Sequence, residues 1–80
     1  MTTSRPLYQI ANEIRTDWKP MYKPAEAHLV AFENATSIDE MYMCDSVKSE
    51  VLYFLGNAGT WRGETARRIK KELKTMAGIK

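Results

Sequence analysis

Apolar residues recur at intervals of three and four positions along most of the chain, which is the spacing of amphipathic helices. The first helix is predicted over residues 5–18, with Ser4 as its N-cap. Pro20 ends it, because the residue before a proline is disfavoured in the α conformation. A second helix is predicted over residues 24–35. The apolar stripes of these two helices are Leu7, Ile10, Ala11, Ile14 and Trp18, and Ala25, His28, Leu29 and Phe32.

The segment after the second helix carries another helix-start signal. Ser37 followed three residues later by Glu40 has the form of a capping box. We therefore expect a short helix here, with Ile38, Met41 and Tyr42 pointing inward.

Asp45 is the expected N-cap of the next helix, over residues 46–56. Its apolar residues cover most of the helix circumference, which is typical of a central element. A buried strand is the alternative, because residues 51–55 also have strand composition.

The last helix is predicted from Thr60 to Met76 or Ala77, and Gly78 ends it. Its apolar stripe is Ala66, Ile69, Leu73 and Met76, whereas Arg67, Lys70, Lys71 and Lys74 fall on the opposite arc.

The start of this last helix holds two unusual residues. Arg62 falls over the apolar stripe, which predicts a half-buried guanidinium paired with Asp17 or Asp45. Gly63 costs helix stability relative to alanine, so its presence predicts close approach by another element.

Together these segments predict an all-α protein, a small compact bundle of four to five short helices in one domain over residues 1–80. Residues 1–4 and 77–80 are expected to be frayed. A chain of 80 residues buries only about 60% of the surface that its unfolded form exposes, so we expect modest stability.

Charge is unevenly distributed along the sequence. Residues 1–61 hold five Lys/Arg and eight Asp/Glu, whereas residues 62–80 hold seven and two. Such asymmetry is typical of an interaction surface or a nucleic-acid contact. It also arises when cations near a helix C-terminus complement the helix dipole.

The composition argues against several classes of enzyme and metal-binding protein. Cys44 and His28 are the only residues of their types, too few for a structural zinc site, and they are a weak basis for a Cys–His enzyme. No phosphate-loop motif is present. We therefore expect no catalytic residues, no metal and no cofactor. The sequence shows neither an apolar span nor a signal-peptide core, so a cytoplasmic protein without a membrane partner is expected.

Three stretches carry a family resemblance: IANEIRTDWK at residues 10–19, SIDEMYMCDSVKS at 37–49 and VLYFLGNAGTWRGETARRIKKEL at 51–73. With them, residues 7–76 resemble a group of small proteins encoded in tailed-phage and prophage genomes. The resemblance implies a phage setting, with the host cytoplasm as the compartment. It carries over no functional residues.

Aromatic and methionine side chains favour protein binding as the function. Trp61, Arg62, Tyr22 and Tyr42 are the predicted contact residues, because Trp, Tyr and Arg are enriched at interface hot spots. The expected partner is a host or phage protein, and an exposed Tyr/Met patch would also suit a homodimer.

Nucleic-acid binding is the alternative function. The predicted helices over residues 46–56 and from Thr60 to Met76 or Ala77 have the outline of a helix-turn-helix unit whose second helix is basic. The predicted contacts are then Arg67, Arg68, Lys70, Lys71 and Lys74. A minor structural component of the virion is a third class.

Overall fold

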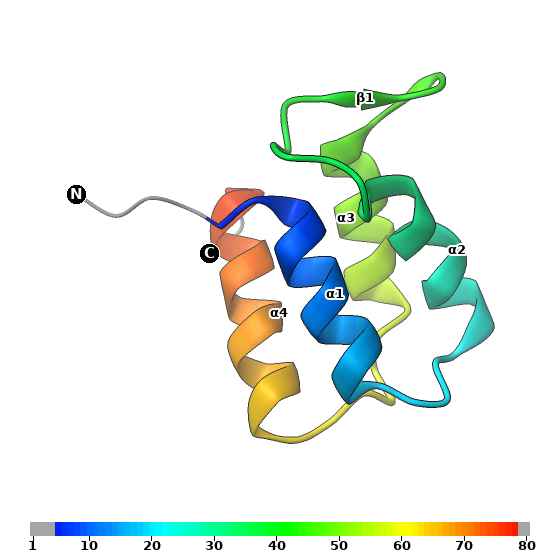
Figure 1. Cartoon of the computed structure of the whole chain (residues 1–80), viewed down its shortest axis with the longest axis vertical. Helices are drawn as coiled ribbons and strands as arrows, with labels where there is room; N and C mark the ends of the chain where they lie inside the picture. Colours follow the sequence, from blue (N-terminus) through cyan, green and yellow to red (C-terminus); the bar gives the residue numbers. More distant parts are fainter. Residues whose placement is uncertain (1–4, 79–80) are drawn as a thin grey trace.

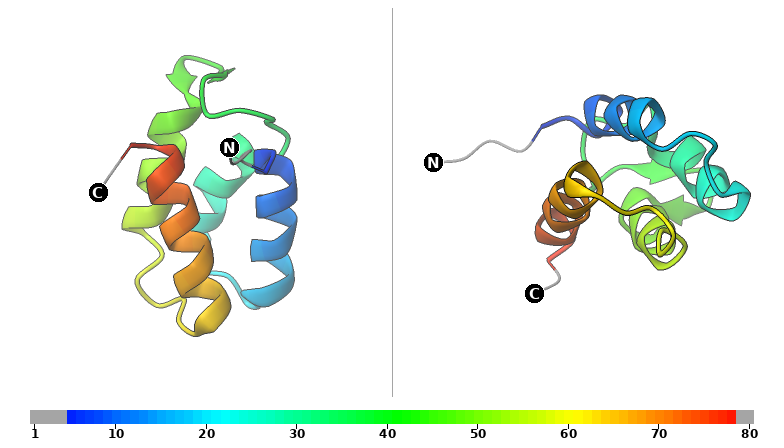
Figure 2. Two further views of the ribbon diagram at one scale, coloured as in Figure 1. Left: turned by 90° about the vertical axis from the view of Figure 1, so that its left-hand side faces the viewer. Right: turned by 90° about the horizontal axis from the view of Figure 1, so that it is seen from below.

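The structure is a computed structural model and describes residues 5–78. This part of the chain forms four helices and one two-stranded hairpin. They are α1 (Leu7–Asp17), α2 (Lys23–Phe32), β1 (Met41–Tyr42), β2 (Asp45–Ser46), α3 (Val47–Gly56) and α4 (Glu64–Met76). The four helices lie side by side and alternate in direction (Figures 1 and 2). The protein is thus mostly helical, and the all-α prediction is corrected by the hairpin. Ser4, the predicted N-cap, lies outside the described residues.

The first turn of α1 is capped by a distant part of the chain. Its N-cap is Pro6, which offers no side-chain hydrogen bond. The N–H of Tyr8 donates to the carbonyl of Ala35 at 2.8 Å, and that of Leu7 donates to Thr36 at 3.1 Å. The loop after α2 therefore satisfies donors that a helix start leaves free.

The predicted short helix after Ser37 is wrong, because its capping groups close a single turn. The Glu40 carboxylate accepts hydrogen bonds from the N–H groups of Ser37 at 2.8 Å and Thr36 at 2.9 Å. The Ser37 hydroxyl accepts from the N–H of Asp39 at 3.1 Å. The capping box is therefore half-formed, and the chain leaves the turn in an extended conformation.

The hairpin that follows brings β1 and β2 together as an antiparallel pair. Met41 lies opposite Ser46, and Tyr42 lies opposite Asp45. The N–H of Val47 donates to the carbonyl of Glu40 at 2.8 Å, so the hairpin leads directly into α3. Met41 and Tyr42 are exposed, contrary to the predicted inward orientation.

Ser46 is the N-cap of α3, one residue after the predicted cap. Its hydroxyl accepts a hydrogen bond from the N–H of Ser49 at 3.1 Å, and Asp45 belongs to the hairpin. The buried residues of α3 recur at helical spacing, so the strand alternative is wrong. These residues are Val47, Glu50, Val51 and Phe54.

Gly63 is the N-cap of α4, three residues after the predicted cap Thr60. Its φ of +114° is rarely adopted by other residues, which explains the glycine. The predicted close approach is wrong, since a Cβ added to Gly63 would meet no neighbouring element within 4 Å. At the other end Ala77, expected to be frayed, is buried, and its N–H donates to the Leu73 carbonyl at 2.9 Å.

The arrangement of α3 and α4 differs from a helix-turn-helix unit. Residues 57–63 connect them, and the two helices run side by side in opposite directions (Figure 1). In a helix-turn-helix unit the helices cross at roughly 90–120° after a turn of three or four residues. The predicted helix-turn-helix arrangement is therefore wrong.

An aromatic cluster occupies the core near the start of α4. Trp61 stacks on Trp18, with ring centroids 5.5 Å apart and an interplanar angle of 6°. Phe54 packs edge-on against both indoles, at 6.1 and 6.4 Å, and against Phe32 at 5.6 Å. The indole Nε1–H of Trp61 donates to Asp17 Oδ2 at 2.8 Å. This cluster joins the end of α1 to α2, α3 and the segment before α4.

We expect Asp17→Ala to lower the free energy of unfolding by about 1–2 kcal/mol, because it leaves the indole N–H of buried Trp61 without its acceptor. Urea unfolding followed by tryptophan fluorescence measures the change. Thr16→Ala, at the neighbouring exposed position, is the control and should stay within about 0.5 kcal/mol of wild type. Equal effects of the two substitutions would contradict a specific role for the Asp17–Trp61 bond.

Candidate functional site

Trp61 lies in the core and is unsuited to the surface role predicted for it. Its side chain is 2% exposed. The prediction started the last helix at Thr60 and assigned Trp61 to a partner-binding surface. In the structure Trp61 precedes α4, and the connecting segment folds its indole inward between α1 and α3.

Arg62 is exposed, and no carboxylate within residues 5–78 forms an ion pair with it. The predicted half-buried pairing is therefore wrong. Asp17, one of its expected partners, accepts the hydrogen bond from Trp61.

Tyr22 and Tyr42 are exposed, but they do not form one patch with each other. Tyr22 is the N-cap of α2, whereas Tyr42 lies in β1, beyond the other end of that helix. A helix of ten residues is about 15 Å long. The four predicted partner residues are thus dispersed over the core and different parts of the surface.

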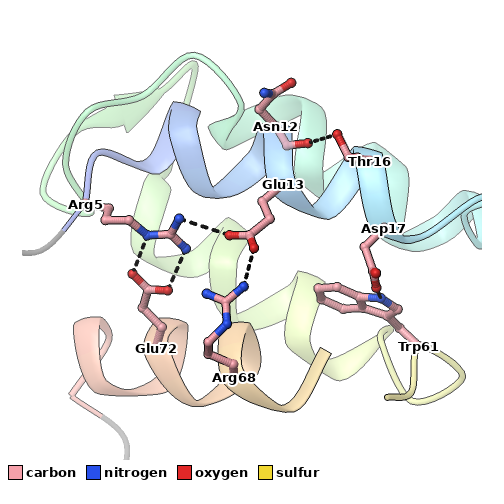
Figure 3. Close-up of polar contacts among 8 residues, drawn as sticks. All are labelled: Arg5, Asn12, Glu13, Thr16, Asp17, Trp61, Arg68 and Glu72. Carbon is pink, nitrogen blue, oxygen red and sulfur yellow. Dashed lines mark hydrogen bonds and ion pairs between the residues drawn. The ribbon is translucent and has the colours of Figure 1, made fainter. Parts of the chain in front are cut away.

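Arg68 belongs to an ion-pair network between α1 and α4 (Figure 3). The network comprises Arg5, Glu13, Arg68 and Glu72. Arg5 donates to both carboxylate oxygens of Glu72, at 2.8 and 2.9 Å, and lies 3.0 Å from Glu13. Arg68 pairs with the other oxygen of Glu13. Arg68, one of the predicted nucleic-acid contacts, is therefore paired with a carboxylate of α1.

The other predicted basic contacts lie on the outer side of α4. Arg67, Lys71 and Lys74 are exposed. Lys70 is half-buried, and its ammonium group donates to the carbonyl of Trp61 at 2.7 Å. Burial lowers the pKa of Lys70, and the charges of Lys74 and Arg62 lower it further.

A run of exposed residues distinguishes the hairpin from the rest of the molecule. Every residue from 39 to 45 is exposed. Four of them are apolar or sulfur-containing, namely Met41, Tyr42, Met43 and Cys44, and three are acidic, namely Asp39, Glu40 and Asp45. Met41 is 64% exposed and Met43 85%. The hairpin stands at one end of the helices (Figure 1), so this apolar area faces outward.

A shallow hollow extends the apolar area of the hairpin onto α2. Its volume is about 190 Å³, and Val30, which is 40% exposed, lies on its α2 side. The residues that line it are Val30, Ala31, Asn34, Ala35, Glu40, Met41, Tyr42 and Val47. We use the name hairpin surface for Val30, Met41, Tyr42 and Met43 together with this hollow.

The tip of the hairpin is built on an unfavourable backbone conformation. Met43 has a φ of +56°, a region that residues other than glycine, asparagine and aspartate rarely occupy. Tight hairpin turns normally place Gly, Asn or Asp at such positions. Met43 is also 85% exposed, so its side chain is largely unburied, and strain of this kind concentrates at functional sites.

Of the residues on the hairpin surface, the sequence predicted only Tyr42 as a contact residue. Val30, Met41 and Met43 were not predicted. Val30 belongs to the predicted second helix, and Met41 was expected to point inward. The tip sequence Met43-Cys44 lacks the Asn-Gly or Asp-Gly signal of a hairpin turn. The one available signal was the density of apolar residues among acidic ones in residues 39–45.

Cys44 and His28 occupy different environments. Cys44 is exposed in the turn between β1 and β2. His28 lies between α2 and α3, where its Nδ1 is 2.8 Å from Glu50 Oε1 and its ring packs against Tyr53. The hydrogen bond satisfies the otherwise buried carboxylate of Glu50, which gives this pair a role in joining the two helices.

Within residues 5–78 no group of three or more His, Cys, Asp or Glu side chains is placed to hold a metal ion. In the same range no helix has the length and apolar character needed to cross a membrane. Comparisons with protein-family models, with curated proteins and with solved structures give no match to this chain.

The network of Figure 3 predicts a pH dependence of stability through Glu13. Its pKa is lowered in the folded protein, chiefly by the hydrogen bond from Arg68 and further by that from Arg5. A lowered folded-state pKa stabilises the fold above the unfolded pKa of about 4.3, and this contribution is lost as the pH falls through the folded value.

We expect Glu13→Gln to lower the free energy of unfolding by up to about 1 kcal/mol at pH 7, because the side chains are partly exposed. The difference from wild type should shrink as the pH falls, since protonation removes the same charge from the wild-type residue. Urea unfolding at a series of pH values measures it. A difference that persists unchanged in acid would mean that packing, and not charge, explains the effect.

Proposed function

We propose that this chain is a small phage-type accessory protein that acts by binding a host or phage protein through the hairpin surface. The observation that supports the proposal best is the hairpin, in which Met41, Tyr42 and Met43 are exposed at successive positions. The phage setting rests on the sequence resemblance alone.

The apolar part of the hairpin surface favours a protein as the partner. Methionine side chains are flexible and polarisable, so they adapt to the shape of a partner, and tyrosine is enriched at interface hot spots. Burying an exposed methionine side chain contributes about 1.5–3 kcal/mol. Two methionines and a tyrosine at one tip, with Val30 beside them, can thus contribute substantially to the stability of a complex.

The charges around the hairpin indicate the chemistry of that partner. Asp39, Glu40 and Asp45 surround the apolar tip, and residues 39–45 contain no lysine or arginine. Opposite charges across an interface speed association and exclude wrong partners. We therefore infer a partner segment with apolar side chains flanked by lysine or arginine.

The hairpin is fixed before binding. Backbone hydrogen bonds pair β1 with β2, and the Val47–Glu40 bond ties the hairpin to the start of α3. A preformed tip loses less conformational freedom on binding than a flexible loop would. The hairpin can thus bind with little rearrangement.

Met43→Gly separates binding from folding. We expect the free energy of unfolding to stay constant or to rise by up to about 1 kcal/mol, because glycine removes the strain at a φ of +56° while its greater unfolded-state freedom offsets part of the gain. Capture of the partner from host extract should decrease at least about tenfold, since the most exposed apolar side chain is lost. Urea unfolding and quantitative capture on immobilised protein measure the two effects.

A matched control and a crosslinking experiment make this test specific. Tyr53→Ser removes an aromatic side chain that is 52% exposed in the second half of α3, away from the hairpin, and should leave capture unchanged. A photo-crosslinking residue at position 43 should give an adduct with the captured protein, and one at position 53 should not. Capture that survives Met43→Gly but is lost in the control would contradict the proposal. An adduct of two copies of the chain would replace the foreign partner with a homodimer.

A further inference from the structure

The outer side of α4 presents a row of positive charges on a surface separate from the hairpin. Arg67, Lys71 and Lys74 are exposed and follow one another at helical spacings of four and three residues. At 1.5 Å per residue, the row from Arg67 to Lys74 extends about 10 Å along the helix axis. No carboxylate within residues 5–78 forms an ion pair with these three side chains.

The row continues into a hollow at the start of α4. The hollow has a volume of about 360 Å³ and is lined by Gly59, Trp61, Arg62, Gly63, Ala66, Arg67 and Lys70. Three of these seven residues are cationic and none is acidic. The hydrogen bond from Lys70 to the Trp61 carbonyl holds the ammonium group in place at 2.7 Å.

The acidic residues at the contact between α1 and α4 do not neutralise this face. Glu13 and Glu72 are both paired within the network between α1 and α4, with Arg5 and Arg68. In sequence, the acidic residue nearest to Arg67 is Glu64, one turn before it, and the one nearest to Lys71 and Lys74 is Glu72, which is paired with Arg5. The asymmetry of charge in the sequence therefore becomes a positive surface in the fold.

We propose that the hollow and the cationic row of α4 bind the phosphate backbone of duplex nucleic acid. A single phosphate would occupy the hollow alone and leave Lys71 and Lys74 unused. Duplex DNA carries about one negative charge per 1.7 Å of its axis, so a row 10 Å long faces several phosphates. This proposal uses a different surface from the hairpin and is independent of the protein partner.

Binding should not depend on base sequence. The side chains of the row are lysine and arginine, which neutralise phosphates, and α3 and α4 lack the helix-turn-helix geometry that would aim them at base edges. Trp61 is buried and cannot stack on an unpaired base. A preference for duplex over single strands is therefore expected, since single-strand binders rely on exposed aromatic residues.

The test is binding of the full chain to a fluorescent mixed-sequence 20-base-pair DNA duplex at 50 and 200 mM salt. With about four phosphates neutralised, affinity should fall about 100-fold over this range. Arg67→Glu/Lys71→Glu should weaken binding at 50 mM at least about tenfold, because it removes two contacts and adds repulsion. A second duplex of unrelated sequence should bind equally well.

The matched control is Lys23→Glu/Lys48→Glu, which makes the same change in net charge at exposed positions of α2 and α3. It should keep most of the affinity, and circular dichroism checks that both variants are folded. Equal loss in the two variants would overturn the proposal, because net charge alone would then explain binding. Met43→Gly should bind DNA like wild type, so failure here and failure of the hairpin proposal are distinguishable.

Competitors identify the chemistry of the ligand. Inorganic phosphate at about 10 mM and constant ionic strength should not displace the duplex. Displacement would assign the hollow to an isolated phosphate and overturn the nucleic-acid proposal. Polyglutamate should bind more weakly than DNA at equal charge concentration, and equal binding would overturn the proposal in favour of an acidic protein segment as the partner.

Discussion

The position of Trp61 is the constraint on which the rest of the structure depends. Its ring stacks on Trp18, its Nε1–H binds Asp17, and its carbonyl accepts the hydrogen bond from Lys70. A residue outside any helix thereby joins the end of α1 to the start of α4. Gly63, with its positive φ, then lets the chain turn from this buried position into α4.

The same arrangement creates both candidate surfaces. Because Trp61 is buried, Arg62 and the first residue of α4 are exposed. Arg62 thus extends the positive surface formed by Arg67, Lys71 and Lys74. The hairpin depends on a different set of hydrogen bonds. The Glu40 carboxylate closes the turn before β1, and the Glu40 carbonyl accepts a hydrogen bond from the N–H of Val47 at the start of α3. A chain of this size thus keeps its core small and presents two chemically different surfaces, one apolar and acidic, the other basic.

Local pattern identified the helices well and their ends poorly. Spacing of apolar residues is a property of one segment, so it predicted α1, α2, α3 and α4 and most of their buried residues. The start of α4 was placed at Thr60 because a threonine can cap a helix locally. Tertiary packing of Trp61 overrides that signal. Two predicted site residues were therefore misplaced. Trp61 was assigned to the surface but is buried, and Arg62 was assigned to a half-buried ion pair but is exposed.

The sequence by itself determined the helical class, the apolar stripes and the charge asymmetry between residues 1–61 and 62–80. Only the tertiary structure decided which charges remain free and which apolar residues stay outside. Glu13 pairs with Arg68 across 55 residues of sequence, and the first turn of α1 is capped by carbonyls that follow α2. Such contacts join segments that no local pattern relates. Met43 is exposed for a similar reason, since no other element of residues 5–78 covers the hairpin tip.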